Sequence, residues 1–210
     1  MPALELLIPF FVATAIFACI PGPGLLYAAA RTMAHGRRAG WQAAIGLHLG
    51  GYAHILAAAF GLAALLDAVP ILYAAVKIAG AAYLVWLGYR MLIARDPVAG
   101  VELRTDSTGP RRALWQSVLV ELLNPKTALF FLAFLPQFVD LAAAFPIWLQ
   151  ILILGTIVNV MFSATDIAFV LLSDRAMRLL AASRTVNRLA HRVGGGILIV
   201  LGVNLAASRQ

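Results

Sequence analysis

Ionisable side chains within the apolar parts of this sequence are the first candidates for chemistry. Glu121 and Lys126 flank the pair Asn124-Pro125 inside one long apolar run, and Asp166 lies inside another. Charged groups in hydrocarbon are costly and are usually functional. Glu121 and Asp166 are therefore candidates for proton coupling, and the Lys126 ammonium is a candidate for binding a substrate carboxylate. The plainer alternatives are a structural ion pair between Lys126 and either carboxylate, and a water-exposed Asp166 at a vestibule.

Two proline-containing motifs interrupt the apolar runs, Pro21-Gly22-Pro23 in the first and Asn124-Pro125 in the fourth. Proline removes a backbone donor and clashes with the carbonyl one turn back, so each helix should unwind there. Unwound backbone inside a membrane must line water or contact protein. Paired interruptions in corresponding segments point to a transporter's binding site, whereas the alternative is two ordinary proline kinks. The predicted substrate-binding residues are Pro21, Gly22, Pro23, Asn124, Pro125 and Lys126.

The elements that position these residues follow from composition. Hydrophobic residues make up 62% of the 210 residues and charged residues 12%, whereas soluble domains are about 45–50% apolar and about 25% charged. A membrane-spanning helix needs about 20 apolar residues. The fold class predicted is an all-α integral membrane protein with six transmembrane helices. The predicted spans are Leu4–Ala30, Trp41–Leu66, Ile71–Ile93, Ala113–Pro136, Phe145–Leu172 and the short, glycine-weakened Val193–Ala207.

Basic residues orient the predicted bundle. Arginines follow the first, third and fifth spans, whereas the connections around Asp67 and Asp140 contain no lysine or arginine. The positive-inside rule then places the arginine-bearing loops in the cytoplasm and both termini outside it. The net charge of +7 is accordingly interpreted as facing the cytoplasm and anionic membrane lipid. No binding of nucleic acid is predicted.

A polar segment divides the chain into two halves. The predicted organisation is a three-helix repeat at 1–94, a cytoplasmic linker at 95–112 and a second three-helix repeat at 113–210. Three spans per half give the halves inverted topologies, an arrangement found in many secondary transporters. Each repeat begins with a broken helix. Small residues such as Gly46 and Gly50 would permit a homodimer without requiring one.

The cysteine and the two histidines of the second predicted span do not predict a cofactor or a metal site. Cys19 is the single cysteine, so neither an intramolecular disulfide nor a cysteine-based metal cluster is expected. His48 and His54 are six residues apart, on different faces of one helix, which disfavours a shared metal. We expect His54 to pack in a small-residue seam with a hydrogen-bond partner. Lys77 is expected to snorkel towards the membrane surface.

Several segments resemble the LysE/RhtB family of amino-acid exporters. They are Pro21-Gly22-Pro23, the run from Lys77 through Gly80 and Tyr83 to Gly88, and Leu123-Asn124-Pro125-Lys126 with the following Leu135-Pro136-Gln137-Phe138. The similarity covers roughly residues 5–140. It implies a multi-pass protein of the bacterial inner (cytoplasmic) membrane that expels amino acids or close derivatives, with proton entry as the driving reaction. The resemblance does not identify which amino acid is the substrate.

The function predicted is a secondary amino-acid exporter and proton antiporter, not an enzyme. The sequence has no Gly-x-x-x-x-Gly-Lys-Ser/Thr phosphate loop, which favours an ion gradient as the energy source. A metal-ion or other small-ion exporter is the first alternative, although Lys126 would compete with a metal at the breaks. A transmembrane thiol oxidoreductase is a remote alternative, because it needs two thiols and the chain has only Cys19.

Overall fold

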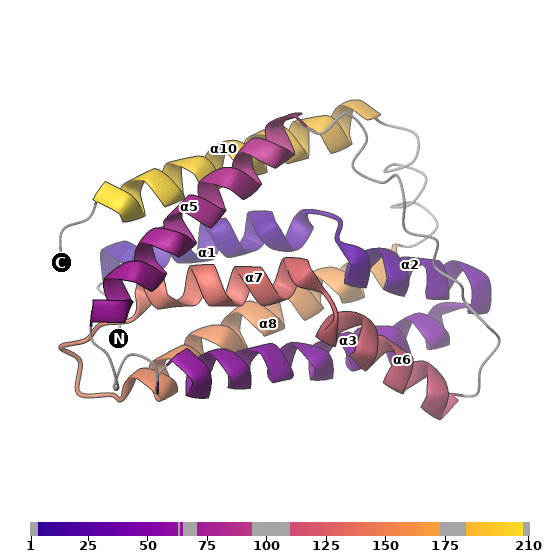
Figure 1. Cartoon of the computed structure of the whole chain (residues 1–210). Helices are drawn as coiled ribbons and strands as arrows, with labels where there is room; N and C mark the ends of the chain where they lie inside the picture. Colours follow the sequence, from indigo (N-terminus) through magenta and orange to yellow (C-terminus); the bar gives the residue numbers. More distant parts are fainter. Residues whose placement is uncertain (1–3, 63, 65–70, 94–109, 173–183, 208–210) are drawn as a thin grey trace.

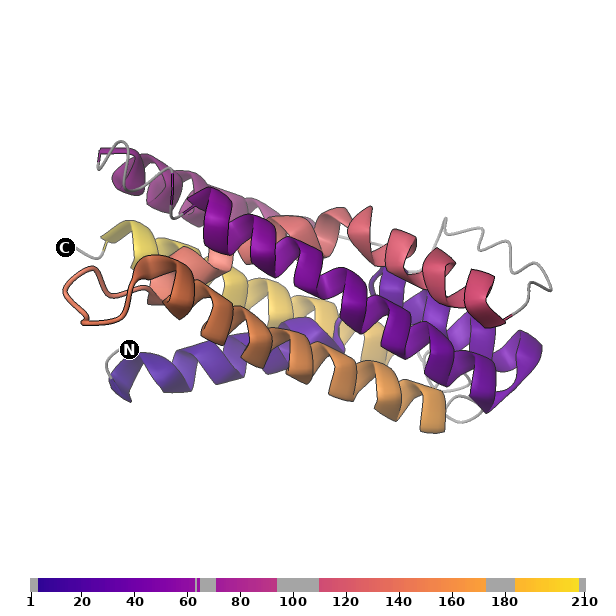
Figure 2. The ribbon, with the colours of Figure 1, turned by 90° about the horizontal axis from the view of Figure 1, so that it is seen from below.

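The computed structural model describes residues 4–62, 64, 71–93, 110–172 and 184–207, and the regular structure in these ranges is helical. The helices form an elongated bundle in which most axes run roughly along one direction (Figures 1 and 2). Together with the composition, this arrangement confirms an all-α membrane protein. The division into two inverted three-helix repeats stays a prediction, as do the repeat and linker boundaries.

Two of the expected spans are bent pairs of shorter helices. Helix α1 (Leu4–Cys19) is followed, after a break of three residues, by α2 (Pro23–His35), at an angle of 46°. Helix α6 (Pro110–Leu122) is followed by α7 (Pro125–Phe134), and this pair, with the 3-10 turn η2 (Leu135–Phe138), is bent by 50°. Both predicted breaks are therefore real interruptions with a change of direction.

The breaks arise from the same local chemistry. Gly22 precedes Pro23 and Asn124 precedes Pro125, and in each case the first residue is the N-cap and the proline is the first helical residue. Proline is favoured at that position, because its missing N–H needs no partner there and its φ suits a helix. Each proline thus ends the preceding helix and starts the next one.

The remaining helices are longer. They are α3 (Arg37–Leu56), continued by a π-helical turn η1 (Ala57–Leu62), α5 (Ile71–Ile93), α8 (Ile147–Leu171) and α10 (Arg184–Ala207). Within the described residues, Arg37–Gly61 and α8 are by themselves long and apolar enough to cross a membrane. Each bent pair also qualifies if it is counted as one span.

The last predicted span is part of a longer helix. The last span was expected to begin at Val193 and to be weakened by its glycines, but α10 begins at Arg184 and has 24 residues. A Cβ at Gly88 of α5 would collide with the backbone oxygen of Gly195, and one at Gly202 would lie 2.7 Å from the oxygen of Ala81. Glycines on both helices therefore allow close packing of α5 against α10, the pair that lies side by side in Figure 1.

Close packing also joins α3 to α6. A Cβ at Gly46 would lie 2.7 Å from the Leu114 oxygen, and one at Gly50 would lie 2.8 Å from the Val118 oxygen. Gly46 and Gly50, which the sequence offered as small residues for close helix packing or a homodimer, are thus used for packing within the chain. This packing brings the polar residues of α3 next to the break between α6 and α7.

Aromatic side chains bring α1 against α7. The rings of Phe17 and Phe130 stack with centroids 3.9 Å apart, and those of Phe10 and Phe134 lie 5.6 Å apart. All four side chains are completely or almost completely buried. Phe17 lies in the last turn of α1, and Phe130 lies in the second turn of α7. This stack therefore holds the two breaks side by side.

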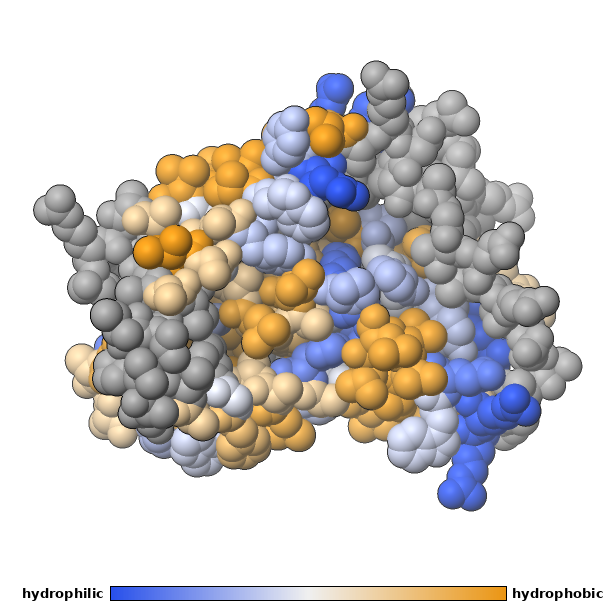
Figure 3. All heavy atoms as spheres, viewed as in Figure 1, coloured by the Kyte–Doolittle hydropathy of each residue, from blue (hydrophilic) through white to orange (hydrophobic). Residues whose placement is uncertain are grey.

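Polar and basic segments gather at one end of the bundle. The α2–α3 connection, the start of α6, the start of α10 and the end of α5 all lie towards that end in Figure 1, whereas α1 begins and α10 ends at the other. Hydrophilic side chains are concentrated where α3 and α6 begin, and hydrophobic ones cover much of the opposite half of this face (Figure 3). This arrangement agrees with the distribution of arginine on which the predicted orientation rests.

Candidate functional site

Lys126 binds two backbone carbonyl groups at the first break, and one of them, that of Phe17, also accepts the Ile20 N–H. The Lys126 Nζ donates hydrogen bonds to the Ile20 oxygen at 2.6 Å and to the Phe17 oxygen at 3.2 Å. It also lies 4.4 Å from the centre of the Phe17 ring, over its face. The structural ion pair considered for Lys126 is therefore not formed among the described residues. Within the described residues, the ammonium donates its hydrogen bonds to backbone oxygens rather than to Glu121 or Asp166.

The second break is organised by Asn124, whose side chain bonds in two directions. Its Oδ1 accepts from the Lys126 backbone N–H at 3.1 Å and caps α7, and its Nδ2 donates to Glu121 Oε2 at 3.0 Å. Asparagine is among the best N-cap residues because its oxygen satisfies an otherwise free amide. Asn124 therefore fixes the start of α7 and the orientation of the Glu121 carboxylate together.

A histidine of α3 binds the carbonyl group at the second break. His54 Nε2 lies 2.8 Å from the Glu121 backbone oxygen. Because that oxygen is only an acceptor, Nε2 must carry the hydrogen. The expectation of a packed, hydrogen-bonded histidine is confirmed. Each break thus has a carbonyl group bound by a side chain from a different helix: Lys126 at the first and His54 at the second.

Glycines of the first break make room for the charged residues of the second. A Cβ on Gly22 would lie 2.7 Å from Lys126 Cδ, and a Cβ on Gly24 would lie 2.7 Å from Glu121 Oε2. Gly22 corresponds to Asn124 in the two matched N-caps, so Gly24 corresponds to Lys126. The two breaks are complementary in shape, one contributing space and the other contributing charged side chains.

A ring of hydrogen bonds joins α3 to α8 beside the breaks. His48 Nδ1 lies 2.5 Å from Ser163 Oγ, which donates to the Asn159 oxygen at 2.8 Å. Asn159 Nδ2 completes the ring by donating to the His48 oxygen at 3.0 Å. Since the serine hydroxyl hydrogen points to Asn159, the hydrogen between His48 and Ser163 belongs to Nδ1.

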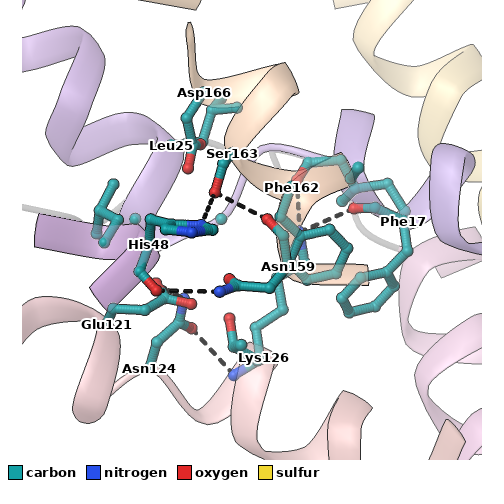
Figure 4. Close-up of a pocket in the computed structure, with 16 residues that line it drawn as sticks. Phe17, Leu25, His48, Glu121, Asn124, Lys126, Asn159, Phe162, Ser163 and Asp166 are labelled. Atoms are coloured by element: carbon teal, nitrogen blue, oxygen red, sulfur yellow. Dashed lines mark hydrogen bonds between the residues drawn. The ribbon is translucent and has the colours of Figure 1, made fainter. Parts of the chain in front are cut away.

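Apart from His54, the residues described above line one cavity, which is partly open to solvent (Figure 4). Of the residues predicted as a site, Gly22, Asn124, Lys126, Glu121 and Asp166 line it. Pro21, Pro23 and Pro125 do not; their contribution is the shape of the backbone. The cavity therefore combines an ammonium group, two carboxylates and interrupted backbone between the two breaks.

The sequence alone gave no role in the site to other residues that line the cavity, among them His48, Asn159, Ser163 and Phe162. The sequence spacing could have linked two of these polar residues to the predicted Asp166. Asn159, Ser163 and Asp166 are spaced by four and three residues, which places them on one face of a helix. The remaining cavity wall is mostly apolar and includes Leu25 and Leu47, with Thr127 as a further polar residue.

Comparison with known proteins covers nearly the whole chain. An uncharacterized membrane protein of Pseudomonas aeruginosa is 34% identical over 197 residues, or 90% of this chain and 89% of that protein. The leucine efflux protein of Enterobacter sp. (strain 638) is 31% identical over 194 residues, 90% and 87% of the two chains. The leucine efflux protein of Klebsiella pneumoniae is 31% identical over 137 residues, 65% of each chain. No solved structure matches.

The match to a protein family includes both breaks and the cavity between them. Residues 15–209 match the family described as LysE type translocator, and every residue that lines the cavity falls within that range. This chain therefore belongs to the LysE type translocator family.

Proposed function

We propose that the protein exports neutral amino acids from the cytoplasm and binds them in the cavity between the two breaks. The observation that carries this proposal is that an ammonium group, two carboxyl groups and backbone carbonyl groups meet in a single cavity between two broken helices. Leucine efflux proteins of two bacteria are similar to this chain over most or two thirds of its length. Amino acids carry the charges that such groups recognise.

The substrate carboxylate is assigned to Lys126 and to the start of α2. An ammonium group has three N–H donors, and the described hydrogen bonds of Lys126 Nζ use two of them. The first amides of α2 carry partial positive charge and also favour an anion. Leu25, Leu47 and Phe162 line the cavity and offer an apolar surface to a neutral side chain. A basic substrate would meet the Lys126 ammonium, which disfavours it.

Proton entry is proposed as the driving reaction, with Glu121 and Asp166 as the coupling groups. Both carboxylates line the cavity, from α6 and α8. A carboxyl group is neutral when protonated and negatively charged when not. Binding of a proton therefore changes its attraction for a charged substrate, which can couple proton entry to substrate export. The proposed location is the bacterial inner membrane, with both termini outside the cytoplasm, as the arginine distribution predicts.

The test is transport by purified protein in liposomes loaded with labelled amino acids. Efflux of leucine should accelerate when protons can enter in exchange, and Asp166→Asn and Glu121→Gln should weaken this dependence on the pH gradient. The control is the same gradient collapsed with a protonophore. Leucine efflux that ignores the gradient would contradict the coupling, and failure to move any of a panel of amino acids would contradict export itself.

A further inference from the structure

The backbone oxygens of Phe17 and Ile20, together with the face of the Phe17 ring, form a site for a cation, which we call the carbonyl cradle. Both oxygens belong to the last turn of α1 or the break that follows it. The carbonyl end of a helix carries partial negative charge, and an aromatic face attracts a cation within about 6 Å of its centre. Lys126 Nζ lies 2.6 Å from the Ile20 oxygen and 4.4 Å from the ring centre.

Lys126 reaches the cradle from another helix. It stands on the first turn of α7, and its chain crosses the break directly over Gly22, where a Cβ would be 2.7 Å from Lys126 Cδ. The ammonium is thus a tethered occupant of a backbone site on a different span. It is the same chemical group that an amino-acid substrate carries at its α-carbon.

We propose that the carbonyl cradle is the binding site for the substrate's ammonium group and that Lys126 is its built-in competitor. On binding, the substrate ammonium takes the cradle, and Lys126 turns to the substrate carboxylate. Charge is conserved in the exchange, because one ammonium leaves the carbonyl groups as another arrives. The inference rests on the proposed export of amino acids, which it deepens by assigning the other charged end of the substrate.

The composition of the cradle selects an alkylammonium over an inorganic cation. Hard metal cations bind in shells of several oxygens, whereas the cradle supplies two carbonyl oxygens and an aromatic ring. An ammonium needs only a few directed acceptors, and it benefits from the ring face. The neighbouring apolar residues Leu25 and Phe162, which line the same cavity, suit the hydrocarbon part of such a ligand.

The experiment measures binding to the purified full chain in nanodiscs by calorimetry. The ligands are leucine and 3-methylbutylamine, which is leucine without its carboxylate. The wild type should bind the amine weakly, because nothing draws Lys126 away from the cradle. Lys126→Met should bind the amine at least about tenfold more tightly, the lower range for hydrogen bonds to a charged group. Leucine binding should weaken in the same variant.

Two further variants keep the test independent of folding. Gly22→Ala retains the charge but displaces the Lys126 chain, so it should also tighten amine binding relative to the wild type. Arg90→Met removes a positive charge that lies over the Trp86 ring, outside the cavity, and should leave amine binding unchanged. Sodium chloride titrated into Lys126→Met should not displace the amine. Displacement by sodium ions would overturn the assignment to an ammonium group.

Amine binding that is equal in the wild type, Lys126→Met and Gly22→Ala would overturn the carbonyl cradle, even if leucine is bound and exported. Conversely, amine binding that rises in both variants while the wild type ignores leucine would support the cradle and contradict the proposed function. The two failures are therefore distinguishable.

Discussion

Single polar side chains in this protein bind backbone groups at the two breaks, in addition to the backbone hydrogen bonds that remain there. Lys126 binds the carbonyl groups at the end of α1, His54 binds the Glu121 carbonyl group, and Asn124 caps α7. Burying an unsatisfied polar group costs about 1–3 kcal/mol, so each of these residues supports the fold as well as the site. A substitution at any of these three residues should therefore be tested for both its thermal stability and its transport activity.

Asn124 allows these two contributions to be separated. Asn124→Ala removes the N-cap and should lower the free energy of unfolding by about 0.5–2 kcal/mol. Asn124→Asp keeps an oxygen acceptor for the Lys126 amide but loses the amide that donates to Glu121. It should therefore retain more thermal stability than Asn124→Ala while transport falls in both. Equal thermal midpoints for wild type and Asn124→Ala would refute the capping role.

Lys126 should be sensitive to the shape of its cation as well as to its charge. Lys126→Ala should weaken leucine binding by about 1.5–3 kcal/mol, the usual worth of a hydrogen bond to a charged group. Lys126→Arg should restore binding poorly, because a planar guanidinium replaces a compact ammonium. Binding is measured by calorimetry on protein that elutes as a single species. Wild-type affinity in Lys126→Ala would remove Lys126 from the site.

At the scale of elements, the approach of α3 to α6 depends on glycine. Gly46→Leu should separate the helices, because a Cβ there already lies 2.7 Å from the Leu114 backbone oxygen. Overpacking of this kind costs about 1–3 kcal/mol, seen as a lower thermal midpoint in detergent. Gly61→Ala is the matched control on the same span, since no described atom lies within 4 Å of its Cβ position. Equal losses in both variants would mean that the contact is unimportant.

His54 connects α3 to the second break and gives a further test of the elements. His54→Leu should lower the free energy of unfolding by about 0.5–1.5 kcal/mol, the net worth of one hydrogen bond. His54→Gln supplies another N–H donor at similar reach and should recover part of the loss. Thermal unfolding of the two variants in the same detergent is the measurement. A fully stable His54→Leu would show that the Glu121 carbonyl group needs no such partner.

The sequence predicted the elements better than the site. Proline acts on the backbone next to it, so Pro23 and Pro125 indicate both breaks from the sequence alone. The start of α10 at Arg184 was missed, because a search for apolar residues cannot detect a helix whose first turns are polar. The ring of His48, Asn159 and Ser163 was missed for another reason: its bonds join α3 to α8, and such pairing depends on tertiary packing.

For the whole molecule, the testable feature is its orientation. The described chain begins and ends at the same end of the bundle, opposite the start of α6 (Figure 1). Because the arginines in the described part of the chain lie towards the opposite end, reporter fusions at Gln210 should show an extracytoplasmic location. Fusions within 95–112 should show a cytoplasmic one. A cytoplasmic signal from Gln210 would require a different number of spans or the reverse orientation.

The fit of Lys126 over Gly22, and of Glu121 against Gly24, also constrains how the sequence can diverge. A larger residue at either glycine collides with a charged side chain from the other half of the chain. A mutation at one position of such a pair therefore displaces the charged group at its partner, and a change at the partner can compensate for it. Lineages descended from this protein should therefore alter positions 22 and 126 together, and positions 24 and 121 together, although about a hundred residues separate the members of each pair in the sequence.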